Sequence, residues 1–177
     1  MTQSLAITAI GADRPGIVNE LTEVLLNAKL NIQDSRMSIL GGEFAIILLV
    51  KGDAASISHI TSNKDRLEQS LNLSLLIKPT SDTNARDAHI RYHIEVEGMD
   101  NPGIVHTLTR YLSQQQINIV NMQTDSSHAA HTGSPMFNVY ILVDIPADKN
   151  IEQLKEEFSR QCDALNMDVD FTAETNH

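Results

Sequence analysis

An internal repeat constrains the fold of this 177-residue chain more than any other feature. Between Ser4 and Asp34, twelve of 31 residues recur 87 positions later without a gap. The first copy reads Ile7-x-x-x-Gly11-x-Asp13-x-Pro15-Gly16-Ile17-Val18-x-x-Leu21-Thr22-x-x-Leu25, followed by Asn31-Ile32. The second reads Ile94-x-x-x-Gly98-x-Asp100-x-Pro102-Gly103-Ile104-Val105-x-x-Leu108-Thr109-x-x-Leu112, followed by Asn118-Ile119. A repeat of this kind indicates two domains of the same fold.

A polar segment without periodicity, Pro79 to Ala88, separates the two copies and has the composition of a linker. We therefore predict a first domain over residues 1–80, a linker over 81–88, a second domain over 89–173 and a tail over 174–177. Phe44 aligns best with Phe137, so the second copy has six more residues, which lie within 126–135.

Each copy has the pattern of a β-α-β-β-α-β unit. Apolar residues spaced three or four apart from Ile17 to Ala28 predict a helix, with Asp13 as its N-cap and Pro15 as its first residue. A second helix is expected over 54–71, strands over 3–11, 31–40, 44–50 and 73–79, and a hairpin turn at Gly41-Gly42. The second copy predicts strands over 92–98, 118–125, 136–145 and 167–171 and helices over 103–115 and 151–165. The fold class is α+β: two ferredoxin-like βαββαβ domains, each an antiparallel sheet with both helices on one face.

The strand from Phe44 to Val50 is apolar at every position. A half-buried strand alternates, so this run predicts that both faces of the strand are covered. The simplest cover for the outer face is the other repeat, packed with pseudo-two-fold symmetry, and a homo-oligomer is the alternative.

The charge argues against direct binding of nucleic acid. The formal net charge is −10, aromatic residues make up 4%, and lysines and arginines form no run. Nucleic-acid binding normally needs a basic face, and single-strand binding needs stacking aromatics.

The remaining composition predicts a cytoplasmic protein without membrane, metal or cofactor. The longest apolar stretch, Phe44 to Val50, is far below the roughly 20 residues that span a bilayer. No signal peptide is recognisable, and the single cysteine, Cys162, excludes an internal disulfide and suits a small buried apolar position. His128-x-x-His131 lacks the acidic or thiol companions of a usual metal site. No nucleophile elbow, phosphate loop or dinucleotide fingerprint occurs, so catalysis is not expected.

The duplicated motif resembles the ACT domain family. The resemblance rests on Gly-x-Asp-(Arg/Asn)-Pro-Gly-Ile-Val before an amphipathic helix and Asn-Ile at the start of the next strand. It implies a regulatory sensor that binds a small amino acid at the loop between the first strand and the first helix. Two such domains with little else resemble the ACT-domain repressors of the glycine cleavage system, which implies glycine as ligand and a transcription activator protein as partner.

The motif has groups that fit a free amino acid. A helix start offers unpaired N–H groups and the positive end of a dipole to a carboxylate, while an aspartate suits the ammonium. The residues expected to bind the ligand are Asp13, Arg14, Pro15, Gly16, Ile17, Asn31 and Ile32, and in the second copy Asp100, Asn101, Pro102, Gly103, Ile104, Asn118 and Ile119. The isoleucines among them would form an apolar wall.

Two alternatives stay open. Asp-x-Pro-Gly before a helix is also a good turn without any ligand, and the difference between Arg14 and Asn101 allows one site to be active and the other degenerate. The function that the sequence favours is a non-enzymatic amino-acid-responsive repressor that acts through a protein partner. The alternative is a detached allosteric subunit of an amino-acid metabolic enzyme.

Overall fold

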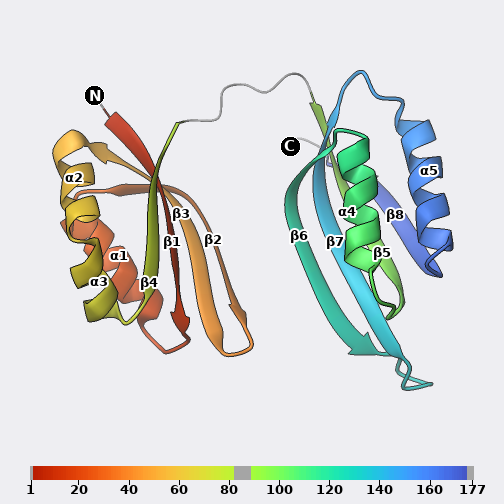
Figure 1. Ribbon diagram of the computed structural model, residues 1–177, viewed down its shortest axis with the longest axis horizontal. Coiled ribbons are helices and arrows are strands. Elements are labelled where there is room, and N and C mark those ends of the chain that lie inside the picture. The colour runs from red at the N-terminus through yellow and green to blue at the C-terminus, as the bar shows by residue number, and fades with distance from the viewer. Residues whose placement is uncertain (1, 82–88, 175–177) are drawn as a thin grey trace. The chain divides into compact units, whose positions relative to one another are not determined.

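The chain divides into two compact units, Met1–Asn84 and Ala85–His177. The computed structural model describes residues 2–81 and 89–174 (Figure 1). The predicted linker, apart from Ser81, and the predicted tail, apart from Glu174, lie outside the described residues. Glu174 itself donates a backbone hydrogen bond to the Arg91 carbonyl, so it continues the second sheet.

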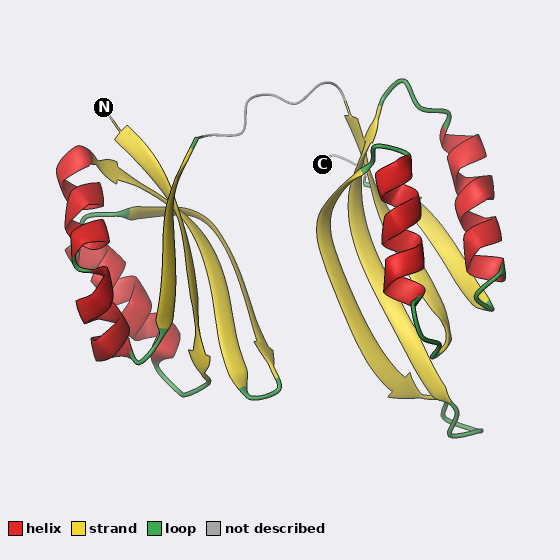
Figure 2. Ribbon diagram, viewed as in Figure 1, coloured by secondary structure: helices red, strands yellow, loops and turns green. Residues whose placement is uncertain are grey.

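Unit 1 is a four-stranded antiparallel sheet with helices on one face (Figure 2). The strand order is β2-β3-β1-β4. Its elements are β1 Thr2–Ala12, α1 Ile17–Asn27, β2 Asn31–Leu40, β3 Glu43–Asp53, α2 Ala54–Ser62, α3 Lys64–Leu71 and β4 Ser74–Thr80.

Unit 2 repeats the plan in the order β6-β7-β5-β8, with helices again on one face of the sheet (Figure 2). Its elements are β5 His89–Met99, α4 Ile104–Gln114, β6 Asn118–His128, β7 Pro135–Pro146, α5 Ile151–Asp163 and β8 Met167–Ala173. The extra residues lengthen the hairpin as predicted, because β6 and β7 pair as far as His128 and Pro135, whereas β2 and β3 pair only to Leu40 and Glu43. The predicted α+β fold with two βαββαβ units is confirmed.

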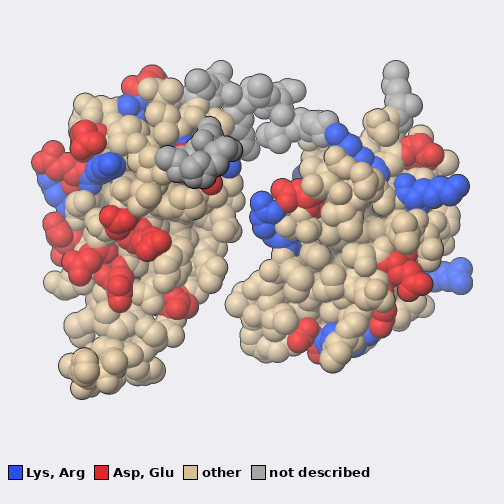
Figure 3. Space-filling model, turned by 180° about the vertical axis from the view of Figure 1, so that it is seen from behind, with Lys and Arg blue, Asp and Glu red and all other residues tan. Residues whose placement is uncertain are grey.

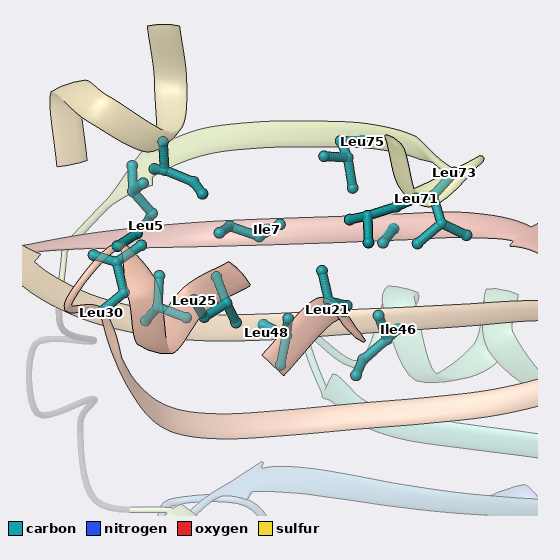
Figure 4. Packing of buried hydrophobic residues seen from close by; sticks show 14 of the residues in the cluster. Leu5, Ile7, Leu21, Leu25, Leu30, Ile46, Leu48, Leu71, Leu73 and Leu75 are labelled. Atoms are coloured by element: carbon teal, nitrogen blue, oxygen red, sulfur yellow. The ribbon is translucent and has the colours of Figure 1, made fainter. Parts of the chain in front are cut away.

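The core of each unit lies between the sheet and its helices. Strand residues that alternate toward the helices meet the apolar stripe of each helix. Figure 4 shows how Leu21 and Leu25 of α1 lie among strand side chains such as Ile7 and Leu48. In unit 2, Phe158 of α5 packs edge-on against Tyr111 and Phe171.

One prediction about unit 1 is wrong, and a second one stays a prediction. The helix expected over 54–71 is interrupted at Asn63, which separates α2 from α3 and donates to the His59 carbonyl through both its backbone N–H and its side-chain amide. Within its unit the β3 strand is covered on one face, and Ile47 on the other face keeps 51% of its surface exposed. That the other repeat covers this second face stays a prediction. Helices cover a single face of the sheet, so every second residue of the apolar run points away from them.

None of the helices that the structure describes is long and apolar enough to cross a membrane.

Candidate functional site

The loop between β1 and α1 is closed by a glycine in the left-handed conformation. Gly16 has φ 90° and is the N-cap, so α1 begins at Ile17. The expected cap at Asp13 and helix start at Pro15 are therefore wrong, because no side chain caps this helix. Glycine adopts positive φ without the penalty that a Cβ imposes. The chain bends at Gly16, and α1 begins at Ile17, two residues after the expected start at Pro15.

The equivalent loop of unit 2 has the same backbone. Gly103 has φ 85°, no side chain caps α4, and the Thr107 amide donates to the Gly103 carbonyl at 2.9 Å. Each loop is hydrogen-bonded to the neighbouring hairpin of its unit. The Asp13 N–H donates to the Gly42 carbonyl at 3.0 Å, and the Asp100 N–H donates to the Pro135 carbonyl at 3.1 Å. The first amides of α1 and α4 thus have no side-chain acceptor.

In unit 1, two charged side chains meet at this helix start. Arg14 donates to both carboxylate oxygens of Glu20, Nη1 to Oε1 at 2.6 Å and Nη2 to Oε2 at 2.5 Å. Nη2 also donates to the Leu71 carbonyl at 3.2 Å. The hydrogen bonds hold the pKa of Glu20 below its ordinary value and raise the pKa of Arg14. We call this bidentate pair the Arg14–Glu20 clasp.

Unit 2 has neutral residues at these two positions. Asn101 replaces Arg14, and its amide nitrogen donates to the carbonyls of Met99 and Leu165 at 3.1 and 3.4 Å. Thr107 replaces Glu20. A Cβ built on Gly103 would meet nothing within 4 Å, whereas one on Gly16 would lie 3.8 Å from Glu20 Oε1. The loop of unit 2 is therefore the more open of the two.

Glu20 was not among the residues that the sequence pointed to. Arg14 and Glu20 are six positions apart, which is not a helical contact spacing, and only the bend at Gly16 brings them together. The available signal was the comparison of the repeats, in which both members of the pair change to neutral residues in the second copy.

The predicted asparagine and isoleucine at the start of the next strand lie at the opposite end of each sheet (Figure 1). Asn31 pairs with Lys51, while the loop of unit 1 lies beside Glu43, eight residues earlier on the same strand. Eight strand residues span about 27 Å, much more than a free amino acid. Asn118 pairs with Asp144 at the corresponding place in unit 2. The structure thus groups the loop residues but does not bring Asn31, Ile32, Asn118 or Ile119 to them within a unit.

The isoleucines of the motif also differ in exposure. Ile17 and Ile104 are 3% and 2% exposed and belong to the two cores, so they support the loops from beneath. Ile32 is 37% exposed. The accessible surface of the two loops includes Asp13 and Asp100 together with the exposed Pro15 and Pro102. In the described part of the chain, no group of three or more histidines, cysteines or carboxylates is arranged to hold a metal ion.

Comparison with known proteins identifies the family of both units. The ACT domain family matches residues 3–78 and 93–172. Among curated proteins, the glycine cleavage system transcriptional repressor of Escherichia coli (strain K12) is 29% identical over 162 residues, which is 92% of this chain and 85% of that protein.

Two solved structures are similar over nearly the whole chain. A protein of unknown function from Galdieria sulphuraria has 30% identity and a TM-score of 0.85, covering 99% of this chain and 100% of that one. A protein provisionally described as a glycine cleavage system transcriptional repressor has 30% identity and a TM-score of 0.75, covering 99% of both chains.

Proposed function

This chain belongs to the ACT domain family. From that premise we propose that it is a non-enzymatic regulator that binds a small amino acid, with glycine as the first candidate. The regulator would repress the glycine cleavage system through a protein partner. The observation that carries the proposal is similarity along 92% of the chain to a protein that is itself a transcriptional repressor of this system. The formal charge of −10 supports action through a protein partner over direct binding to DNA, because an acidic protein is repelled by DNA phosphates.

The β1–α1 and β5–α4 loops supply the chemistry for the ligand. At each helix start, backbone amides and the positive end of the helix dipole attract a carboxylate. Asp13 or Asp100 offers a carboxylate to the ammonium group. Ile17 and Ile104 are buried, so these groups address the carboxylate and ammonium that all amino acids share. Glycine is the first candidate because the similar Escherichia coli protein is a repressor of the glycine cleavage system.

Thermal unfolding tests ligand binding. A ligand that binds only the folded state stabilises it, by about 2.7 kcal/mol when its concentration is 100 times Kd. We expect glycine at millimolar concentration to raise Tm. Acetate, which has only the carboxylate, and methylamine, which has only the ammonium group, should raise Tm much less. Unchanged melting curves with all twenty amino acids would contradict the sensor function.

Substitution locates the binding. Asp100→Asn should reduce the glycine-dependent rise in Tm while leaving Tm without ligand nearly unchanged. Asp163→Asn, which removes an equal charge at the end of α5, is the matched control and should retain the rise. Equal responses of the two variants would remove Asp100 from the site.

A mobility-shift assay tests the partner. Glycine cleavage promoter DNA is mixed with this protein alone, with the transcription activator of that promoter alone, and with both, each with and without glycine. We expect no shift by this protein alone and a glycine-dependent change of the activator complex. A shift by this protein alone would replace the partner route with direct DNA binding, and stable association with a metabolic enzyme in place of the activator would favour an allosteric subunit.

A further inference from the structure

We propose that the groove between α1 and the α2–α3 pair of unit 1 is a docking site for a partner protein that inserts an aromatic side chain next to a carboxylate. The groove lies at the C-terminal half of α1, at the other end of this helix from the β1–α1 loop. The inference therefore goes beyond the proposed function and does not depend on glycine as ligand. It follows from a comparison of the groove with the same place in unit 2.

The groove has an apolar floor and a polar rim. The helices that form it lie on one face of the sheet (Figure 1), and its volume is about 340 Å³. Ile60 and Ala28 are buried at the bottom, with 3% and 8% of their surfaces exposed. The remaining lining residues are the half-buried Val24, Leu67 and Asn63 and the exposed Asn27, His59, Arg66 and Ser70.

In unit 2, a tyrosine bridges the two helices at the corresponding place. Tyr111 stands 87 positions after Val24, which is the offset that relates α4 to α1. Its ring packs edge-on against Phe158 of α5 with the ring centroids 5.7 Å apart, and its hydroxyl donates to Glu157 Oε2 at 3.0 Å. Only 7% of the tyrosine surface is exposed. Val24 carries no ring that could make these contacts in unit 1.

The interruption of the second helix lies at the same groove. Asn63, which separates α2 from α3, is one of the lining residues, whereas α5 of unit 2 runs without a break from Ile151 to Asp163. The helix layer of unit 1 thus lacks an aromatic side chain and a continuous second helix at one place. The resulting recess offers an apolar floor to an aromatic ring from outside.

The charge at the groove is complementary to an acidic partner. The lining residues include Arg66 and His59 and no carboxylate, although the whole chain has a formal net charge of −10. Within the described ranges, Arg66 forms no ion pair. A guanidinium at the edge of an apolar recess suits a carboxylate that arrives beside the aromatic ring. Tyr111 and Glu157 combine the same two groups, a ring and a carboxylate, within unit 2.

The openness of the groove favours a protein over a free small molecule. Pockets for small ligands bury most of the ligand surface, whereas four of the nine lining residues here are exposed. Protein interfaces instead use one aromatic anchor in a recess, and the surrounding contacts exclude water from it. The occupant is therefore an aromatic residue with an acidic neighbour on the surface of a partner protein.

Chemical shifts of the full chain test the groove with a defined probe, the peptide acetyl-Glu-Tyr-Glu-amide. The methyl groups of Val24, Ile60 and Leu67 should shift with this peptide. They should shift much less with acetyl-Glu-Ala-Glu-amide, which lacks the ring, and with acetyl-Lys-Tyr-Lys-amide, which has the opposite charge. Arg66→Gln should weaken binding of the first peptide about threefold, as expected for an exposed ion pair. Arg110→Gln, which removes an exposed cation from unit 2, is the control and should leave binding unchanged.

The tyrosine of unit 2 can also be transferred to unit 1. Val24→Tyr should fill the groove and abolish the peptide-dependent shifts of Ile60 and Leu67. Leu26→Tyr adds the same ring to α1 at a position that is 73% exposed and does not line the groove, so it should retain these shifts. The wild-type shifts and Arg66→Gln decide the inference even where Val24→Tyr fails to fold.

Three outcomes would overturn the inference. Unshifted groove methyl groups in the wild-type chain would remove the docking site. Tighter binding of free tyrosine than of the peptide would make it a small-molecule site, and dimerisation of the wild-type chain that Val24→Tyr abolishes would assign it to a second copy. Each outcome leaves the proposed function standing, because the rise in Tm with glycine is measured without the peptide.

Discussion

Glu95 and Asp170 lie directly opposite each other on β5 and β8, on the face of the sheet that the helices do not cover. Glu97 and Asp168 repeat this arrangement two residues along, and the four residues line a shallow hollow together with Asn138 and Tyr140. No lysine or arginine within the described ranges pairs with any of the four carboxylates. Figure 3 shows acidic side chains gathered on this unit. The same register positions in unit 1 are uncharged: Thr8, Ile10, Ser74 and Leu76.

Neutralising one of these carboxylates should stabilise unit 2. Like charges directly opposite each other on neighbouring strands are destabilising, so Glu95→Gln should raise the free energy of unfolding by about 0.5 kcal/mol at low ionic strength. The gain should shrink in high salt, where exposed charges are screened. All three tyrosines (Tyr92, Tyr111 and Tyr140) lie in unit 2, so tyrosine fluorescence during urea unfolding follows this unit selectively.

Asp148→Asn is the control for this charge change, because Asp148 is exposed in the turn between β7 and α5 and lies outside the sheet. It should leave the urea midpoint nearly unchanged. Equal gains from Glu95→Gln and Asp148→Asn would mean that net charge, and not the cross-strand pair, sets the effect.

Gly98 is expected to be much less tolerant of alanine than a turn glycine. A Cβ there would lie 2.5 Å from Met167 Sδ, 2.7 Å from the Asn166 carbonyl oxygen and 3.0 Å from Met167 Cα. Because two of these atoms are backbone, β5 and β8 would have to separate, and Gly98→Ala should cost about 3 kcal/mol. Gly133→Ala, at φ 67° with nothing within 4 Å, should cost only the left-handed strain of about 1 kcal/mol. Tyrosine fluorescence in urea measures both, and similar losses would contradict the steric explanation.

Much of the fold could be predicted, because the repeat shows that there are two similar units and the spacing of apolar residues shows which face of each helix or strand is buried. The strand Asn31–Leu40 has the bounds that the sequence indicated, and the Gly41-Gly42 turn has positive φ at both residues. The break at Asn63 could not be seen in this way. Ile57, Ile60, Leu67 and Leu71 all pack against the core of unit 1 on both sides of Asn63, so the apolar period carries no sign of the interruption between α2 and α3.

The candidate site was less predictable than the fold. The recurrence of Asn31-Ile32 as Asn118-Ile119 grouped these residues with the loop, yet a strand that follows an antiparallel helix starts at the far end of the sheet. Residues that recur in two copies reflect the shared fold as well as shared chemistry. Comparison of the repeats marks Arg14 and Glu20 as positions at which the loops differ, but their contact could be recognised only once the bend at Gly16 was known.

The Cys162 thiol should be inert in the folded protein. It is fully buried in the core of unit 2, as its sequence position on α5 suggested, and burial raises its pKa to about 12. The thiolate is the reactive form, so its modification by a thiol reagent at pH 8 should be about a thousandfold slower than that of an exposed cysteine. Reaction should accelerate in parallel with the loss of the tyrosine signal in urea. Fast modification before that transition would contradict burial as the controlling factor.

The Arg14–Glu20 clasp should make the stability of unit 1 depend on pH in the acidic range. Hydrogen bonds from Arg14 lower the pKa of Glu20 in the folded state, so between the folded and the ordinary glutamate pKa the unfolded chain binds more protons at this residue. The clasp therefore contributes its full stabilisation above the ordinary glutamate pKa and loses it as the pH falls through the lower, folded value. Glu20→Gln should lower Tm at pH 7, and the difference from wild type should fade below the ordinary glutamate pKa. Glu23→Gln, on the same helix and exposed, is the control and should show no such trend, as followed by circular dichroism from pH 7 to pH 3. A Tm difference for Glu20→Gln that stays constant over this range would show that the carboxylate charge of Glu20 does not hold the loop of unit 1.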